Sequence, residues 1–148
     1  MKLKKISAIL LCCSLFLSTQ CDEDEVPVEY EPGCDAFNVI VDAAEYQNAE
    51  SGTFALVGNE YNGDCLLVSF SASGCSGDTW DLRLIDSDEI LESFPPQRNL
   101  RLVLINNEAC LAVFTQFREF DLRALRIEGN NEVILNIEGF SESITYSY

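Results

Sequence analysis

Residues 80–85 read Trp-Asp-Leu-Arg-Leu-Ile, in which apolar and charged side chains alternate. Successive side chains of a β-strand point to opposite faces of its sheet, so this pattern predicts a strand with one buried face. Residues 100–105 and 132–138 repeat the alternation. No long stretch after residue 36 has the 3.6-residue period of an amphipathic helix, and we therefore predict an all-β domain.

Nine segments are strand candidates by this criterion: residues 36–41, 53–57, 65–71, 80–85, 100–105, 111–117, 124–128, 132–138 and 143–148. Turn-forming residues separate them, and Gly129-Asn130-Asn131 is the clearest hairpin signal because it joins two alternating runs. Sheets of such strands must cover each other's apolar faces. The spacing predicts an antiparallel, immunoglobulin-like β-sandwich of about seven to nine short strands, and a barrel is the alternative.

The first 20 residues have the features of a signal peptide. Three lysines near the N-terminus precede an apolar stretch at residues 6–17. A permanent transmembrane helix needs about 20 apolar residues, and this stretch is shorter. We expect residues 1–20 to be removed on export.

Cys21 directly follows this leader and precedes four acidic residues. The segment resembles a bacterial lipoprotein signal. This resemblance implies that Cys21 becomes the acylated first residue of the mature protein and that its lipid anchors the protein to the outer membrane. The acidic run is similar to the signal that exports such lipoproteins to the cell surface in Bacteroidota; a periplasmic orientation is the other option. Ordinary cleavage near Gln20, which leaves Cys21 as a thiol, is the alternative. We expect residues 21–33 to form an acidic tether and residues 34–148 a single domain.

Charge and composition exclude several classes of function. The segment after residue 20 contains six arginines and 25 acidic residues, a formal charge of −19, and all three lysines precede it. Nucleic-acid binding requires clustered cations that displace counterions, so no nucleic-acid partner is expected. The chain has no histidine, which removes Ser-His and Cys-His nucleophile pairs and histidine zinc sites. A mature chain without lysine also lacks a Ser-Lys dyad, and we expect no cofactor.

Four cysteines remain when the leader and Cys21 are set aside: Cys34, Cys65, Cys75 and Cys110. An even number in an exported chain predicts two disulfides, and four cysteines allow three connectivities. We favour Cys34–Cys65 with Cys75–Cys110. The first bond would fasten the start of the domain to a strand, and the second would tie the turn at residues 74–77 to a later strand. A four-cysteine zinc site is the competing interpretation, although the spacing contains no C-x-x-C pair.

Two loops carry candidate binding residues. Asp86, Asp88 and Glu89 place three carboxylates within four residues after a predicted strand, and oxygen clusters of this kind bind calcium. The alternative is a solvated acidic loop without a metal. In the sequence Phe-Pro-Pro-Gln-Arg, the proline pair fixes an extended backbone that would display Phe94 and Arg98 to a partner. The alternative is a rigid crossover with Phe94 in the core.

The C-terminal strand and the acidic residues offer two weaker candidates. Tyr146 and Tyr148 share one face of the last predicted strand, and such aromatic rows either receive sugars or close the edge of a core. Paired carboxylates can catalyse glycoside hydrolysis. Among 25 acidic residues, however, the sequence singles out no pair.

A further set of motifs lies between about residue 62 and residue 148: Gly74-Cys75-Ser76-Gly77 with Trp80, Pro95-Pro96-Gln97-Arg98 with Leu100 and Leu102, Asn107-Glu108 with Cys110, Phe120-Asp121-Leu122, and a hairpin from Gly129 to Gly139. Together they resemble small Bacteroidota lipoproteins of uncharacterised role. The resemblance implies an envelope protein without an assigned activity. We therefore expect a non-catalytic cell-envelope lipoprotein, an interaction or structural module with an unidentified protein or glycan partner. The alternatives are a carbohydrate- or calcium-binding accessory domain and, less favoured, a small carboxylate-based enzyme.

Overall fold

The computed structural model describes Cys34 and residues 36–148. The predicted signal peptide (residues 1–20), the lipidation site Cys21 and the tether (residues 21–33) lie outside the described residues and stay predictions. Within the described part, the strands are β1 (Phe37–Asn38), β2 (Ile40–Val41), β3 (Ala55–Asn62), β4 (Cys65–Gly74), β5 (Asp81–Leu91), β6 (Gln97–Ile105), β7 (Ala112–Asp121), β8 (Glu132–Ile137) and β9 (Ile144–Ser147). The chain also forms a helix, α1 (Ala43–Asn48), and a 3₁₀ turn at Leu122–Leu125.

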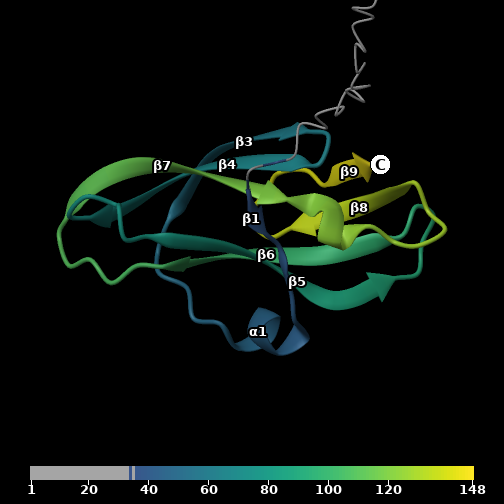
Figure 1. The fold of residues 1–148 in the computed structure, drawn as a ribbon. Helices are drawn as coiled ribbons and strands as arrows, with labels where there is room; N and C mark the ends of the chain where they lie inside the picture. The colour runs from purple at the N-terminus through teal and green to yellow at the C-terminus, as the bar shows by residue number, and fades with distance from the viewer. Residues whose placement is uncertain (1–33, 35) are drawn as a thin grey trace, which may run out of the picture. The chain divides into compact units, whose positions relative to one another are not determined.

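The strands form two stacked sheets, and the predicted β-sandwich is confirmed (Figure 1). One sheet has the order β1-β7-β4-β3 and the other β2-β5-β6-β8-β9. Both sheets are mixed and not wholly antiparallel, because β1 pairs with β7, β2 with β5, and β6 with β8 in parallel. The last of these has a topological reason: the 3₁₀ turn and the loop after it carry the chain from β7 into the other sheet, where β8 enters alongside β6 in the same direction.

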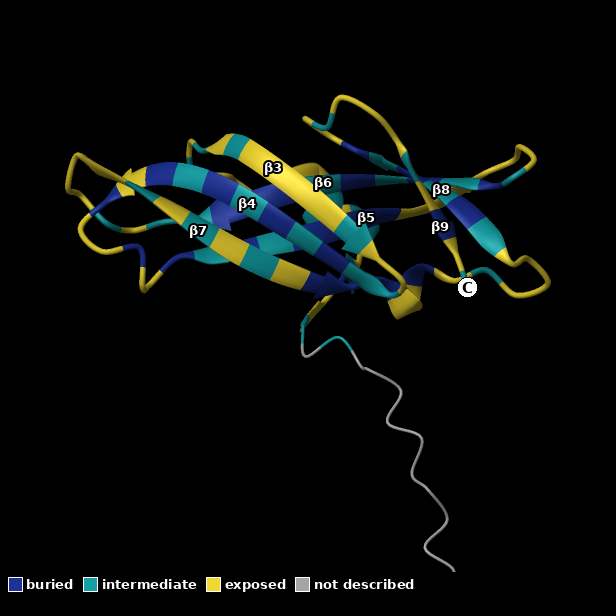
Figure 2. Cartoon of the chain, turned by 90° about the horizontal axis from the view of Figure 1, so that it is seen from above, coloured by how far each residue is buried: buried dark blue, intermediate teal, exposed yellow. Residues whose placement is uncertain are grey.

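The inner faces of the two sheets enclose one apolar core. Figure 2 shows the alternation of buried and partly exposed residues along β4. Its inward side chains are Leu66, Val68, Phe70 and Ala72. The five-stranded sheet contributes Leu82, Leu84, Leu100, Leu102, Leu104, Val133, Leu135 and Tyr146. The strands predicted from two-residue alternation therefore owe their placement to burial of one face.

The predicted strand at residues 36–41 is divided between the two sheets. β1 pairs with β7 in the four-stranded sheet, whereas β2 pairs with β5 in the five-stranded sheet. Val39, between them, is buried in the core. The entering chain thus crosses from one sheet to the other within five residues.

Helix α1 was not expected from the sequence. Asp42 precedes it, and its Oδ1 accepts a hydrogen bond from the Glu45 N–H at 2.8 Å, which satisfies one of the free donors of the first turn. The helix packs on β5, on the side of the five-stranded sheet that faces away from the other sheet (Figure 1). Ile85 is fully buried there.

Two sequence expectations about secondary structure are wrong. Residues 124–128 do not form a strand, so Gly129-Asn130-Asn131 does not close a hairpin. The side chain of Asp121 accepts the Arg123 N–H and starts the 3₁₀ turn instead. Residues 86–89 are not a loop but a bulged part of β5, where the register with β6 shifts between Asp86 and Ile90. Among the described residues, no helix is long and apolar enough to cross a membrane.

Candidate functional site

Phe94 stands at the tip of the β5–β6 connection, in what we call the Phe94 loop (residues 92–96). Its side chain is 96% exposed, which contradicts the alternative that placed it in the core. Ile90 and Leu91, at the end of β5, are also exposed. Pro96, by contrast, is buried, so the loop is fixed at its base and open at its tip.

Arg98 lies in β6 at the base of this loop and does not reach the surface beside Phe94. It is buried, and its Nη1 donates to Oδ1 of the fully buried Asp86 at 2.8 Å. Burial raises the pKa of Asp86, and the neighbouring Arg98 opposes that rise. We expected Phe94 and Arg98 to be displayed together. In the structure Phe94 is exposed, whereas Arg98 is buried and anchors the base of the loop.

The carboxylates proposed for calcium do not converge. Asp86 is turned into the sandwich, whereas Asp88 and Glu89 are exposed. Asp88 has a positive φ of 58°, and its N–H donates to Asp86 Oδ1 at 2.8 Å. These three residues are not among the described groups whose ligand atoms come within 4.8 Å of one another. The hydrogen bond between Asp88 and Asp86 lies within the β-bulge itself.

Both favoured disulfides are confirmed. Cys34 bonds to Cys65 and Cys75 to Cys110, with Cα–Cα separations of 5.5 and 4.8 Å. The first joins the start of the domain to β4. The second joins the loop after β4 to the segment just before β7. The competing interpretation of a four-cysteine zinc site is therefore wrong.

The turn at residues 74–79 encloses the carboxylate of Glu108. Its Oε2 accepts the backbone N–H groups of Cys75, Ser76 and Gly77, and its Oε1 accepts the hydroxyl of Thr79 at 2.7 Å. These hydrogen bonds, with Thr79 first, lower the pKa of Glu108 to about 2. Successive N–H groups of this kind form an anion-binding nest, which here binds an anion of the same chain.

The C-terminal tyrosines close the core and do not form an open aromatic row. Tyr146 is fully buried, donates to Asp64 Oδ1 at 2.5 Å and accepts from Arg126 Nε at 2.9 Å. Burial and the bond to Asp64 raise the pKa of Tyr146 to about 12. Tyr148 accepts the N–H of Ile127. The sugar-receiving interpretation of these two residues thus loses its geometric basis.

Each arginine of the described part has a partner within the chain. Arg83, Arg98, Arg123 and Arg126 form ion pairs with carboxylates. Arg101 donates to the carbonyl groups of Tyr46 and Ala49, and Arg118 donates to the carbonyl of Trp80. The three lysines, at positions 2, 4 and 5, lie outside the described residues. The described surface therefore offers carboxylates and no uncommitted cation to a partner.

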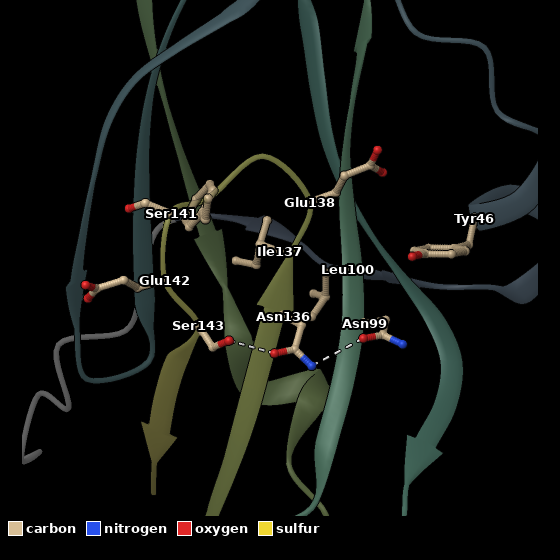
Figure 3. Close-up of a pocket in the computed structure, with 10 residues that line it drawn as sticks. Tyr46, Asn99, Leu100, Asn136, Ile137, Glu138, Ser141, Glu142 and Ser143 are labelled. Atoms are coloured by element: carbon tan, nitrogen blue, oxygen red, sulfur yellow. Dashed lines mark hydrogen bonds between the residues drawn. The ribbon is translucent and has the colours of Figure 1, made fainter.

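A groove on the outer face of the five-stranded sheet was missed by the sequence analysis. It has a volume of about 360 Å³, and we call it the α1 groove. Tyr46 projects from α1 toward it, Asn99 and Asn136 come from β6 and β8, and Glu142 and Ser143 come from the β8–β9 loop (Figure 3). Asn99 and Asn136 occupy outward positions in two strands whose apolar and polar residues alternate. The sequence alone therefore indicates that both side chains face outward.

The described part of the chain is thus a disulfide-linked β-sandwich domain with a displayed aromatic loop and a polar groove. No family model and no curated protein sequence matches it. Among solved structures, it is similar to a protein of unknown function, DUF1344, from Bacteroides vulgatus, with a TM-score of 0.53 and 16% identity over 76% of this chain. The match covers 56% of that protein, so the chain spans just over half of its length.

A second solved structure, a protein from Parabacteroides distasonis described as toxin-related, gives a TM-score of 0.49 at 16% identity. That match covers 76% of this chain and 59% of that protein. At this level of identity the first similarity concerns the fold alone, and the second carries no argument. The structural neighbours are uncharacterised proteins from Bacteroidetes.

Proposed function

We propose that the chain is a non-catalytic module of the bacterial cell envelope, anchored to the outer membrane through Cys21, that engages a protein partner through the Phe94 loop. The observation that carries the proposal is the 96% exposure of Phe94 on a loop whose base is fixed. A rigid, exposed aromatic side chain is a typical anchor of a protein interface, because little conformational entropy is lost when it is buried.

The residues around Phe94 define the chemistry of the partner. Ile90 and Leu91, at the end of β5, are further exposed apolar residues, and Asp88, Glu89 and Glu92 of the same segment are exposed carboxylates. An apolar centre with a charged rim is the usual anatomy of an interface. The complementary surface is therefore an apolar pocket with a basic rim, and association should weaken as salt screens the rim.

The address rests on the leader and the cysteines. A cationic start, a short apolar stretch and Cys21 form a lipoprotein-type signal. Two disulfides in a chain of this size are typical of an oxidising compartment. Both features support an envelope location, and the acidic residues after Cys21 support the cell surface.

The anchor is tested by metabolic labelling with palmitate in the native host. We expect the wild-type chain to carry label, and globomycin, which blocks lipoprotein signal peptidase, to cause the precursor to accumulate. Cys21→Ser should lose the label. Full processing of Cys21→Ser together with an unlabelled wild-type chain would contradict the lipid anchor while leaving the Phe94 proposal open.

The interaction is tested by replacing Phe94 with the photoreactive aromatic residue p-benzoylphenylalanine in the native host. We expect one dominant protein adduct after irradiation. The matched control carries the same residue at Glu60, which is exposed on β3. With the partner identified and purified, Phe94→Ala should weaken binding about thirtyfold or more, the effect of an interface hot spot.

Two results would reject this interface. One is the same set of adducts from positions 94 and 60, which indicates random contacts. The other is an unchanged affinity of Phe94→Ala for the partner identified by crosslinking. Adducts with lipid alone at position 94 would mean that the loop contacts the membrane and not a protein.

A further inference from the structure

The polar side chains beneath the α1 groove are held in one orientation by their own hydrogen bonds. Asn136 Nδ2 donates to Oδ1 of Asn99 at 3.3 Å and to Oε1 of Gln97 at 3.0 Å. Asn136 Oδ1 accepts the hydroxyl of Ser143 at 2.7 Å. Figure 3 shows Ser143, Asn136 and Asn99 in one row across the strands. Because the amide is planar, the Asn99 oxygen faces Asn136 and its nitrogen faces away, on the side of Tyr46.

The Asn99 nitrogen has no hydrogen-bond partner among the described residues, so both of its N–H groups are available to a ligand. The carboxylates of Glu138 and Glu142, which also line the groove, make no side-chain hydrogen bond within the described part and offer acceptors. The groove thus combines oriented donors with free acceptors. Such a set matches a ligand that both donates and accepts hydrogen bonds at neighbouring positions.

Tyr46 supplies an aromatic wall, and its position is fixed from behind. The guanidinium of Arg101 donates to the carbonyl groups of Tyr46 and Ala49 at 2.8 and 3.3 Å, which holds the last turn of α1 against the sheet. In Figure 3 the ring of Tyr46 extends from the helix toward the strand that carries Asn99 and Leu100. An aromatic ring with a hydroxyl tip presents an apolar face and a polar end to a ligand.

Charge narrows the class of ligand. No arginine lines the α1 groove, and two carboxylates do, so phosphate, sulfate and uronate groups are disfavoured. A neutral sugar has vicinal hydroxyls that both donate and accept, together with a C–H face that packs on an aromatic ring. We propose that the α1 groove binds a neutral saccharide, with one sugar ring against Tyr46 and its hydroxyls bonded to Asn99 and to Glu138 or Glu142.

The size of the groove agrees with this assignment. Its volume of about 360 Å³ lies within the range of roughly 300–1,000 Å³ found for small-molecule sites. A second hollow of about 510 Å³ shares Glu138 with it and is also lined by Phe54 and Ser51. Two neighbouring hollows fit a chain of sugars better than a single ring. This site is independent of the Phe94 loop, whose tip lines neither hollow.

The proposal is tested by isothermal titration calorimetry on the purified full chain with cellotriose, maltotriose and mannotriose. We expect at least one of them to bind with a dissociation constant in roughly the millimolar range or tighter, with little dependence on salt. Trigalacturonate, the anionic counterpart, should not bind. A trilysine peptide tests whether the carboxylates select a cation instead. Binding of trilysine alone would overturn the saccharide assignment, as would binding of none of the neutral trisaccharides.

Two substitutions connect the binding to this groove. Asn99→Asp keeps the size of the side chain and the acceptor for Asn136 but replaces the free donors with an anion, and we expect it to weaken the sugar at least about tenfold. Tyr46→Ala should have a similar effect, and Tyr46→Phe should retain most of the affinity.

Phe117→Ala is the matched control, because it removes an exposed aromatic ring on β7 that lines neither hollow and should leave the sugar affinity unchanged. Circular dichroism confirms that each variant is folded. Unchanged affinity in folded Asn99→Asp and Tyr46→Ala would place the sugar elsewhere and reject the site, whatever the fate of the Phe94 interface.

Discussion

The loop at residues 74–79 joins β4 of one sheet to β5 of the other, and the Phe94 loop joins the neighbouring strands β5 and β6. The two loops are held in different ways. The first is closed by the Cys75–Cys110 bond and by the carboxylate of Glu108. Its glycines are required by close contacts: a Cβ on Gly74 would clash with that carboxylate and lie 2.8 Å from the Trp80 ring. All of these contacts are internal to the chain.

The Phe94 loop has no covalent bond across it and is held from below by the ion pair of Arg98 and Asp86. The charged groups at its base, Arg98 and Asp86, bind each other, whereas the apolar side chain of Phe94 at its tip is exposed to water. The first loop therefore satisfies its hydrogen bonds and its carboxylate within the domain. The Phe94 loop is fixed at its base and leaves an apolar side chain exposed at its tip. The predictions below test this difference through stability.

The largest effect is expected at the base of the Phe94 loop. Asp86→Asn leaves the guanidinium of Arg98 buried without a counter-charge, and removal of one member of a buried pair costs about 3–5 kcal/mol. Urea unfolding should show this loss. The control is Asp81→Asn, which breaks an exposed pair with Arg83 and should cost no more than about 1 kcal/mol. Equal losses in the two variants would mean that the buried pair does not anchor the loop.

The disulfide of the first loop comes next. Replacing Cys75 and Cys110 together with alanine should lower the free energy of unfolding by about 2–4 kcal/mol, because the unfolded chain gains conformational entropy when the crosslink is removed. Thermal and urea unfolding at neutral pH measure it. The equivalent replacement of Cys34 and Cys65 provides the comparison. A double variant as stable as wild type would show that Glu108 alone holds the loop.

Acid should weaken the same loop through Glu108. Its pKa falls from an ordinary 4.5 to about 2 in the folded protein, so its stabilising effect is complete above about pH 4.5 and is lost as pH falls toward 2. Glu108→Gln should lower the melting temperature at pH 6 and flatten its fall from pH 5 to pH 2. Asp64 and Asp121, whose pKa values are also lowered by hydrogen bonds from Tyr146 and arginines, retain part of the acid sensitivity.

For Glu108, the control is Glu60→Gln, which alters an exposed carboxylate on β3. This variant should follow the wild-type melting temperature across the whole pH range. A Glu108→Gln profile parallel to that of wild type would mean that the carboxylate does not close the loop in solution.

The smallest effect on stability is expected at the tip. Phe94→Ser removes a side chain without packing partners and should change the free energy of unfolding by no more than about 0.5 kcal/mol. Phe70→Ala, in the core, should cost about 3–5 kcal/mol for the same loss of an aromatic ring. A loss above about 1.5 kcal/mol at Phe94 would mean that the ring packs within the domain in solution and is not displayed.

Most of the sandwich could be predicted because alternation reports burial of one face. It located β4, β6 and β8 to within a few residues, and it found the start of β5 but not its second half. It failed at residues 36–41, where the run of strand-forming residues is continuous although the chain changes sheets at Val39. It also failed after β7, where Leu122 and Leu125 are buried by a 3₁₀ turn and not by a strand.

The candidate sites were predicted only in part, although the sequence held more information than was used. Asp86 has the same parity as Leu82 and Leu84, and Arg98 has the same parity as Leu100. Both charges therefore occupy inward positions, from which a buried ion pair follows. The α1 groove required knowledge of which strands are neighbours, and no local pattern supplies that.

The crossing of the entering chain between the sheets has a mechanical consequence. Any pull applied ahead of Cys34 first meets the covalent bond to Cys65 and is passed to β4, which lies between β7 and β3. Behind that bond, β1 and β2 distribute the remaining load over both layers at once. A domain built in this way resists unfolding one strand at a time when force acts on its N-terminal end.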